Sequence, residues 1–417
     1  MELADEKDRT LEVEIERLLP GGVGLAHAEG MTLFVSLAAP GDVLRVRLDR
    51  VQGKVGFASI VEVLKPSPVR IAPPCPYFGR CGGCDFQQLT YEAQLEAKVE
   101  IIRDCLHRIA KIEMPSGIDM RHSPNQWRYR ARANWQVDSV AKLLGYFERG
   151  SNRVCDVEYC AVLVPELQET LERLRREMLA ETATGQLRDI DAVVGDEGVS
   201  VAPPVAGFRT DIVSRTIGNE TYYFSADAFF QVNHELLEPL IATAIGEARG
   251  KAAIDLYCGV ALFTLPLARR FEKVFGIEAS APATEFARRN IQRAKQEGSP
   301  IRREGAESKV GTADLGMVQI VTALVGDWLN QHSRSLGPVD FLLLDPPRTG
   351  CENRDIAGIL ALRPAQISYV SCDPATLARD LQKLITNGYS LDSIAAFDMF
   401  PQTHHVETVA RMSLGNR

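Results

Sequence analysis

The feature that most constrains the fold is a regular alternation of apolar, strand-like runs with helical segments from residue 231 to the C-terminus. The runs 252–256 and 341–344, for example, are each followed by a segment with helical character. Such alternation predicts a mostly parallel sheet with helices on both faces. Open sheets of this kind bind ligands beyond the carboxyl ends of their strands. The chemistry of this chain is therefore expected at those strand ends.

One of these strand ends carries a cysteine. Residues 367–370 predict a short buried strand and residues 374–377 open a helix, so Cys372 lies between a strand end and a helix N-terminus. The positive end of a helix dipole favours the thiolate, which is the nucleophilic form of cysteine. A lone buried cysteine is more often part of a core, and on position alone that alternative stays open.

Four other strand-like runs end in carboxylates. Asp255 precedes a turn at Gly259, and Glu278 follows 23 positions after Asp255, where Rossmann-like sheets carry a ribose-binding carboxylate. Asp327 and Asp345 follow the next two apolar runs. A single glycine turn does not favour a pyrophosphate. The predicted ligand is therefore a nucleoside-like cofactor, and S-adenosylmethionine fits that description better than NAD.

The N-terminal part of the chain has a different pattern, in which apolar and polar residues alternate between glycine and proline turns. The clearest strand-like runs are residues 11–15, 31–35, 43–48 and 57–64. Five strands within about 55 residues suit a small barrel of the oligonucleotide-binding type. A barrel with only a structural or docking role is the alternative.

Three cysteines, Cys75, Cys81 and Cys84, follow a short proline-containing linker with the spacing C-x5-C-x2-C. Nine cysteines in a chain of this composition argue for metal, cluster or catalytic thiols rather than disulfides. Sulfurs at this spacing can converge on one centre, with a fourth thiolate from Cys160 or from its competitor Cys155. One C-x2-C pair plus an outlier favours an iron–sulfur cluster over zinc, which usually takes two such pairs.

The net charge of the chain is -8, yet residues 121–153 contain seven basic and two acidic residues. Residues 126–135 alternate at period two, which predicts a strand with Arg128, Arg130 and Arg132 on one face beside aromatic side chains. Such a face suits the phosphates and unstacked bases of RNA. An edge strand kept soluble by its charge is the alternative.

The composition is that of an ordinary globular protein, with 45% hydrophobic and 24% charged residues. The sequence contains no apolar run of about 18 residues, and its first ten residues are charged rather than a basic and apolar leader. We therefore expect a cytoplasmic protein that does not enter a membrane. We also expect it to be a monomer.

Several motifs resemble those of the RNA uracil-5-methyltransferases, in particular the branch with a TRAM domain and an iron–sulfur cluster that modifies 23S ribosomal RNA. These motifs are Gln231, 255–259 (DLYCG), 345–348 (DPPR), 371–380 (SCDPATLARD) and 400–407 (FPQTHHVE). The resemblance covers nearly the whole length. It implies an α/β fold with an OB-like TRAM barrel (1–65), a central α+β RNA-binding domain with the cluster (66–230) and a Rossmann-like class I methyltransferase domain (231–417).

The resemblance also implies a role for each matching residue. A [4Fe-4S] cluster would be held by Cys75, Cys81, Cys84 and Cys160. S-adenosylmethionine would contact Gln231, Tyr257, Glu278, Asp327 and Asp345. Cys372 would be the nucleophile and Glu407 the base, while the TRAM barrel and the Arg128–Arg132 region would hold RNA. The helix at residues 90–110 is expected to pack on the methyltransferase domain, although it lies within the central one.

The implied reaction explains why these residue types are needed. Addition of the Cys372 thiolate to carbon 6 of uracil makes carbon 5 nucleophilic, so that it can accept a methyl group. Carbon 5 then carries both a methyl group and a proton, and Glu407 must remove that proton before the thiolate can leave. A carboxylate in a partly desolvated pocket has the raised pKa that suits this step. The target base must be unpaired or flipped out of a helix.

The chain departs from the family pattern at Ala261 and Leu262, where a second glycine and a small polar residue are usual. A side chain at Ala261 could crowd the methionine part of the cofactor. An RNA-binding or assembly factor with weak or lost activity is therefore an alternative function. The same methylation of tRNA is a second alternative, and a redox protein that uses its cysteines is a third.

Overall fold

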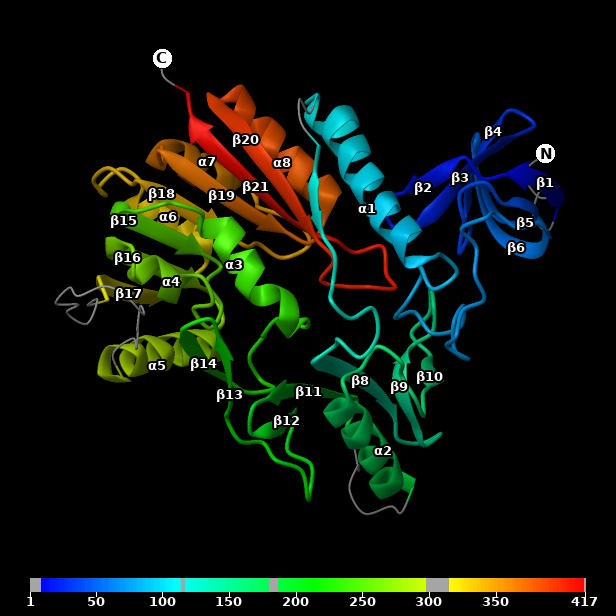
Figure 1. Ribbon diagram of the computed structural model, residues 1–417, viewed down its shortest axis with the longest axis horizontal. Helices are drawn as coiled ribbons and strands as arrows, with labels where there is room; N and C mark the ends of the chain where they lie inside the picture. Colours follow the sequence, from blue (N-terminus) through cyan, green and yellow to red (C-terminus); the bar gives the residue numbers. More distant parts are fainter. Residues whose placement is uncertain (1–8, 114–116, 180–186, 298–314, 416–417) are drawn as a thin grey trace, which may run out of the picture.

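The computed structural model describes residues 9–113, 117–179, 187–297 and 315–415. Figure 1 shows a small β-lobe at the N-terminus, a second lobe around the strands β8–β12, and a large sheet flanked by helices that contains the C-terminal half of the chain. Within the described residues, no helix is both long enough and apolar enough to cross a bilayer.

The N-terminal lobe is a six-stranded sheet in the order β1-β5-β6-β4-β3-β2. Its strands are β1 (Thr10–Glu14), β2 (Arg17–Leu19), β3 (Val23–Ala28), β4 (Met31–Val35), β5 (Val43–Gln52) and β6 (Val55–Lys65). Alternate residues such as Leu33, Val35, Leu44 and Val46 are buried in its core. We expected five strands. The sixth is β2, which pairs with β3 across a turn at Gly21 and Gly22. β2 is too short for an alternation of apolar and polar residues to reveal it.

The second lobe is a five-stranded antiparallel sheet in the order β10-β9-β8-β11-β12. Its strands are β8 (Arg132–Asp138), β9 (Leu143–Phe147), β10 (Val154–Asp156), β11 (Asp189–Gly195) and β12 (Gly198–Ala202). The helix α2 (Pro165–Leu179) packs on it through Leu167, Leu171 and Leu174. A hairpin of β13 (Val213–Ile217) and β14 (Glu220–Phe224) then leads to the large sheet.

The large sheet has eight strands in the order β17-β16-β15-β18-β19-β21-β20-β7. They are β7 (Asp119–Arg121), β15 (Gly250–Leu256), β16 (Phe271–Glu278), β17 (Met317–Thr322), β18 (Phe341–Leu344), β19 (Gln366–Ser371), β20 (Tyr389–Phe397) and β21 (Glu407–Leu414). The strands β15 to β19 are parallel, whereas β21 runs antiparallel to β19. This is the predicted Rossmann-like α/β fold.

Helices cover both faces of the large sheet, as the apolar runs predicted. They are α3 (Leu237–Ile245), α4 (Thr264–Ala268), α5 (Ala281–Glu297), α6 (Val325–His332), α7 (Asn353–Leu362) and α8 (Pro374–Thr386). Along β18, Phe341 and Leu343 face the core with α3 to α5, whereas Leu342 and Leu344 face the core with α6 to α8. A strand buried on both sides needs such a continuous apolar run.

The helix α1 (Tyr91–Cys105) precedes the second lobe in sequence but packs on α8 of the large sheet. The hydroxyl of Thr90 accepts a hydrogen bond from the backbone nitrogen of Ala93 (3.4 Å) and so caps its N-terminus. A π-helical turn (Leu106–Ala110) extends it, and Ile101 and Ile102 enter the apolar core beneath α8.

Two local predictions were wrong. The strand expected over residues 126–135 begins only at Arg132, because Arg128 has a left-handed φ of 54° that interrupts an extended backbone. The apolar run before Asp327 was expected to be a strand that ends in this carboxylate, but the strand β17 ends at Thr322. Asp327 therefore lies in the first turn of α6 rather than at a strand end.

Candidate active site and cysteine cavity

The position of Cys372 is set by a strand end and a capped helix. β19 ends at Ser371, and α8 starts with Pro374 at its first position. The side chain of Asp373 accepts hydrogen bonds from the backbone nitrogens of Ala375 (3.0 Å) and Thr376 (2.8 Å). Proline and a carboxylate cap are both typical of a helix N-terminus, so the local sequence holds Cys372 in place.

Glu407 is the first residue of β21, the antiparallel neighbour of β19. The register pairs Ser371 with Thr408, and the next pair in an antiparallel register is Cys372 with Glu407. Glu407 is only 3% exposed, and its Oε1 atom has no hydrogen-bond partner among the described residues. Burial and the nearby carboxylate of Asp345 raise the pKa of Glu407 well above its ordinary value.

The expectation that the helix dipole would make Cys372 a thiolate was wrong. Burial, Glu407 and Asp345 together raise the pKa of Cys372 to about 12, and the capping carboxylate of Asp373 acts in the same direction. Only Arg348, of the residues that act on this thiol, lowers its pKa. The protein alone therefore holds Cys372 in its protonated form.

Three carboxylates meet at the carboxyl ends of β16, β15 and β18, where the strand order reverses. Burial and Glu278 raise the pKa of Asp345 to about 7. The fully buried Asp255 accepts a hydrogen bond from Thr264 Oγ1 (2.5 Å), but burial, Asp345 and Glu278 still raise its pKa to about 8. Its Oδ1 atom has no partner in the described structure. Three carboxylates this close together, one of them with an oxygen that has no partner among the described residues, are suited to a cation or to further hydrogen-bond donors.

The turn after β15 brings further predicted residues to this edge. Glu278 accepts hydrogen bonds from the backbone nitrogens of Gly259 (3.2 Å) and Ser280 (2.7 Å). Tyr257 has a φ of 62° and donates its hydroxyl hydrogen bond to Asp355 (2.7 Å). Ala261 also has a left-handed φ, 77°, a conformation that glycine adopts without steric cost.

The remaining predicted cofactor residues lie in different settings. Gln231 is buried in the segment between β14 and α3. Asp327 is 55% exposed, and it forms an ion pair with Arg354 (2.8 Å). The structure therefore brings Cys372, Glu407 and Asp345 together, and it leaves Asp327 in a surface ion pair.

Two residues near the centre were not among the predicted site residues. Arg348 lowers the pKa of both Cys372 and Glu407, and Asp255 belongs to the carboxylate cluster. Both lie in motifs that the sequence analysis used, the segment 345–348 and the strand end at 255. Their position in these motifs was a usable signal for both.

The four predicted cluster ligands line a single cavity in the second lobe. Cys75, Cys81, Cys84 and Cys160 surround it together with aromatic residues and Arg130. Burial is the main cause that raises the pKa of Cys81 to about 11, and the neighbouring thiols add to it. The fourth lining thiol is Cys160 rather than Cys155.

Cys155 lies outside this cavity, and its sulfur accepts a hydrogen bond from Arg80 Nε (3.2 Å). Over residues 9–113, 117–179, 187–297 and 315–415, no three His, Cys, Asp or Glu side chains are close enough to hold a single metal ion.

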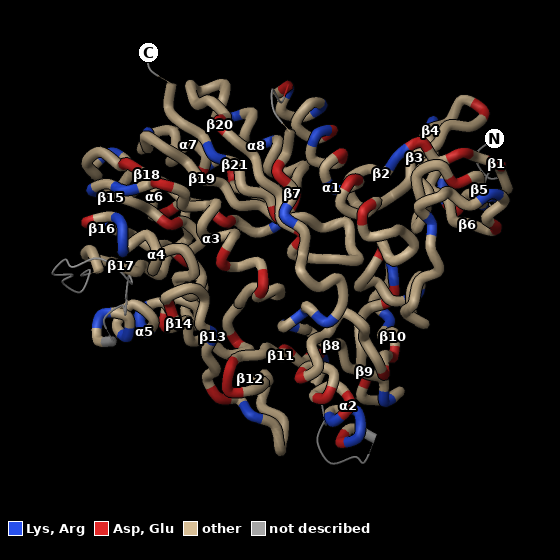
Figure 2. Tube along the Cα trace, viewed as in Figure 1, with Lys and Arg blue, Asp and Glu red and all other residues tan. Residues whose placement is uncertain are grey.

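The predicted arginine face does not form. Arg130 lines the cysteine cavity, and Arg132 forms an ion pair with Asp191 (3.1 Å), so that only Arg128 of the three is exposed. Figure 2 shows acidic positions interspersed with basic ones along the backbone of this lobe. Part of the positive charge of residues 121–153 therefore lies inside the protein or is paired with an acidic residue, and is not exposed on a surface.

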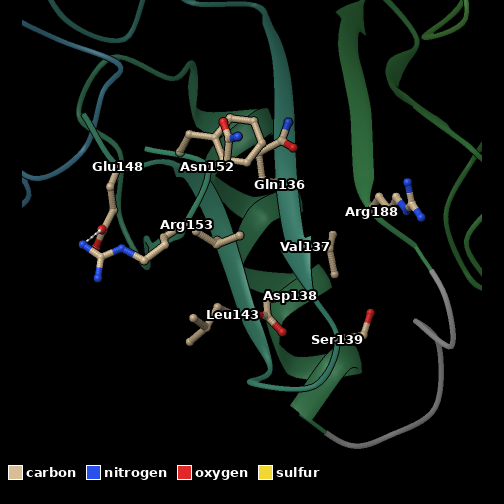
Figure 3. Close-up of a pocket in the computed structure, with 11 residues that line it drawn as sticks. Gln136, Val137, Asp138, Ser139, Leu143, Glu148, Asn152, Arg153 and Arg188 are labelled. Atoms are coloured by element: carbon tan, nitrogen blue, oxygen red, sulfur yellow. Dashed lines mark ion pairs between the residues drawn. The ribbon is translucent and has the colours of Figure 1, made fainter. Parts of the chain in front are cut away.

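A cavity of about 720 Å³ lies on the same lobe, beside β8, β9 and β10 (Figure 3). Its rim includes Gln136, Asp138 and Arg188 and the ion pair between Glu148 and Arg153 (2.8 Å). None of the predicted site residues lines it. Its size therefore does not identify it as the reaction centre.

Comparison with known proteins agrees with this arrangement. The family model described as tRNA (Uracil-5-)-methyltransferase matches residues 208–413, and the TRAM domain model matches residues 6–61. A protein of Alkalilimnicola ehrlichii named 23S rRNA (uracil(1939)-C(5))-methyltransferase RlmD is 33% identical, over 96% of this chain and 95% of its own. A protein of the same name from Nitrosospira multiformis is 31% identical, over 98% and 99%.

A solved structure shares the fold of the whole chain. The Pyrococcus abyssi tRNA (uracil-54, C5)-methyltransferase, in complex with S-adenosyl-L-homocysteine, superposes with a TM-score of 0.73. It is 23% identical, and the match covers 96% of this chain and 99% of the other. Together with the sequence relatives, these observations show that the chain belongs to the TRAM-containing family of S-adenosylmethionine-dependent RNA uracil-5-methyltransferases.

Proposed function

We propose that this protein methylates carbon 5 of a specific uridine in 23S ribosomal RNA. The family defines the type of reaction, and the choice of RNA rests on full-length relatives whose names specify 23S rRNA. The solved relative that is named for tRNA is less similar in sequence. The single observation that carries the proposed mechanism is the proximity of Cys372 and the buried Glu407, which lie just beyond the last pair of β19 and β21, Ser371 with Thr408, and act on each other electrostatically.

In the proposed reaction, the Cys372 thiol gives up its proton to water and adds as a thiolate to carbon 6 of the uracil, and carbon 5 then takes the methyl group of S-adenosylmethionine. Glu407 removes the proton that remains on carbon 5, and the carbon–sulfur bond breaks to release the Cys372 thiolate. Glu407 suits this role because burial and Asp345 raise its pKa, which makes its carboxylate a stronger base. Arg348 is placed to stabilise negative charge on Cys372, since it lowers the pKa of that thiol.

We assign the cofactor site to Gln231, Tyr257, Glu278, Asp327 and Asp345. Bound S-adenosylmethionine supplies an electrophilic methyl group on a positively charged sulfur. The residues fit such a ligand, because Asp345 and Asp255 are carboxylates with raised pKa values that a cation would relieve. Glu278, anchored by two backbone nitrogens, is placed to accept hydrogen bonds from ribose hydroxyls.

We assign a [4Fe-4S] cluster to Cys75, Cys81, Cys84 and Cys160. Four thiols around one cavity fit this ligand. The C-x5-C-x2-C spacing, with one C-x2-C pair and an outlier, favours this ligand over zinc, which usually takes two such pairs. Its role would be structural, since methyl transfer moves no net electrons.

We propose that the enzyme works as a monomer in the cytoplasm. A single chain supplies Cys372, Glu407 and the three clustered carboxylates, so the reaction needs no residue from a second copy. The TRAM barrel and the exposed Arg128 are the proposed RNA contacts.

The test is a trapping experiment with RNA that carries 5-fluorouridine at the target position. Fluorine on carbon 5 cannot be removed as a proton, so the covalent adduct with Cys372 should persist. We expect mass spectrometry to show a stable adduct with the native protein and none with Cys372→Ala. Cys105→Ala is a control for the loss of another thiol, because Cys105 is a buried cysteine of α1, whereas Cys372 is partly exposed.

Fragments of 23S RNA and of tRNA in parallel reactions would decide between the two substrates. An adduct that persists in Cys372→Ala would refute the assigned nucleophile. An RNA-binding factor without turnover, the alternative suggested by Ala261, predicts that calorimetry detects no binding of S-adenosylmethionine.

A further inference from the structure

The loop 398–406, which joins β20 to β21, leads directly into Glu407. It is tied to the rest of the protein at both ends. The side chain of Lys98 on α1 forms a buried ion pair with Asp398 and donates a hydrogen bond to the carbonyl oxygen of Phe400 (3.1 Å). The hydroxyl of Tyr129 donates to the carbonyl oxygen of Pro401 (2.9 Å). These contacts hold the half of the loop that follows β20.

The half of the loop that precedes Glu407 is held by Asp85. The carboxylate of Asp85 accepts one hydrogen bond from the backbone nitrogen of His404 (2.8 Å) and lies 2.5 Å from His404 Nδ1. The backbone nitrogens of Asp85 and Phe86 both donate to the carbonyl oxygen of Gln402 (3.1 and 3.0 Å). Among the described hydrogen bonds from outside the loop, those of Asp85 to His404 lie closest in sequence to Glu407.

Asp85 directly follows Cys84 of the cysteine cavity, so the same short segment serves both places. Arg149 donates a hydrogen bond to the carbonyl oxygen of Cys84 (2.8 Å), which ties this segment to the second lobe. The N-terminal barrel reaches the same point. A Cβ atom on Gly22 would lie 3.0 Å from His404 Cβ and 3.3 Å from the Asp85 carboxylate. All three lobes therefore meet at the contact between Asp85 and His404.

We propose that Asp85 is a positioning residue for proton removal, which aligns Glu407 through His404 and the end of the loop. This inference rests on the function proposed above. The step it serves moves the proton of carbon 5 to the Glu407 carboxylate. The electron pair of that bond restores the double bond between carbons 5 and 6, and the bond from carbon 6 to sulfur breaks, which releases the Cys372 thiolate.

We expect loss of the Asp85 carboxylate to slow proton removal from carbon 5, and not to abolish every step of the reaction. If Glu407 is misaligned, Cys372 still adds to the base and methylation still occurs, but the adduct resolves slowly. Misplacement of a catalytic group by about 1 Å can cost about a hundredfold in rate. We expect Asp85→Ala to lower turnover by about ten- to a hundredfold and to accumulate the covalent adduct on ordinary uridine RNA.

The experiment compares full-length native protein with Asp85→Ala, Asp85→Asn and Asp104→Ala. Asparagine keeps one oxygen, which can still accept the hydrogen bond from the His404 backbone nitrogen, so Asp85→Asn should recover turnover to within about fivefold of native, the size of one ordinary hydrogen bond. Asp104, which pairs with Arg17 of the barrel (3.0 Å) and Arg108 (2.8 Å), is the control for an acidic residue at a lobe contact away from the loop.

Three measurements on each protein separate the outcomes: the rate of 5-methyluridine formation, the fraction of enzyme bound covalently to RNA, and the iron content. Slow turnover with accumulated adduct and native iron in Asp85→Ala supports the inference. Native turnover, or adduct formation lost in step with iron, overturns it. If the native protein forms no 5-methyluridine at all, it is the proposed function that fails.

Discussion

Two buried carboxylates beside the strand β19, Asp380 and Glu407, differ in their hydrogen bonds. Asp380 of α8 is fully buried, and its oxygens accept hydrogen bonds from Tyr369 (2.9 Å), the backbone nitrogen of Cys351 (2.9 Å) and Arg379 (2.9 and 3.0 Å). Glu407, on the neighbouring strand, is equally buried but has an oxygen without a partner among the described residues. Asp255 shares this deficit.

The difference separates structure from function. Buried polar groups are nearly always hydrogen-bonded, so a carboxylate that lacks a partner indicates a place kept for something else. Asp380 uses its hydrogen bonds to join α8 to β19 and to the segment before α7. The carboxylates near Cys372 instead lack such partners, and the proposed function supplies them with a cationic cofactor and a substrate proton.

The largest expected effect is that of Glu407→Gln. Glutamine has nearly the same shape but cannot take up the proton, so we expect turnover to fall by about a thousandfold, the size of a typical general-base contribution. The covalent adduct on ordinary uridine RNA should accumulate, as measured by denaturing gels in a single-turnover experiment. Turnover within about tenfold of native would show that another group removes the proton.

The next prediction contrasts the fully hydrogen-bonded Asp380 with Asp345, one of the clustered carboxylates near Cys372. Asp380→Ala should lower the free energy of unfolding by about 3 kcal/mol, because it leaves Arg379, Tyr369 and a backbone nitrogen without their partner. Asp345→Asn should leave that free energy unchanged or raised, and should abolish detectable S-adenosylmethionine binding. Urea denaturation would measure the free energy of unfolding of both variants, and calorimetry would measure their binding of S-adenosylmethionine. Equal destabilisation by the two substitutions would show that Asp380 and Asp345 do not differ in their structural role.

A pH dependence of stability follows from the carboxylates with raised pKa. Asp255, with a pKa of about 8, and Asp345, with a pKa of about 7, bind protons more tightly when folded than when unfolded. Their contribution to the free energy of unfolding is therefore complete below about pH 4 and is lost as the pH rises towards 8. Asp345→Asn should flatten this decline by on the order of 4 kcal/mol. If the free energy of unfolding fell with pH equally in the variant and the native protein, the raised pKa of Asp345 would be contradicted.

The smallest effect is expected at the exposed carboxylate. Asp327 and Arg354 form a surface ion pair, 55% and 46% exposed, and such pairs contribute little to stability. Asp327→Asn should change the free energy of unfolding by less than about 0.5 kcal/mol. Calorimetry would then measure its role in cofactor binding without interference from folding, and unchanged affinity would remove Asp327 from the proposed cofactor site.

The parts that could be predicted are those set by local sequence. The continuous apolar run 341–344 identified a strand buried on both faces, and residues 367–377 identified the junction that holds Cys372. The failures also have local causes. Arg128 interrupts the expected strand with a left-handed φ, which no alternation of residue types records. Asp327 follows an apolar run that continues from β17 into α6, so the strand end could not be read from hydrophobicity.

The amino-acid sequence by itself determined the order of strands and helices and placed a thiol and several carboxylates at strand ends, because periodicity and helix caps depend on near neighbours. Only the tertiary structure decided that Glu407 lies opposite Cys372, that the thiol is held protonated, and that Asp85 meets His404. Strand register, burial and charge–charge interactions depend on groups far apart in the chain, and these set the pKa values and the reach of each catalytic group.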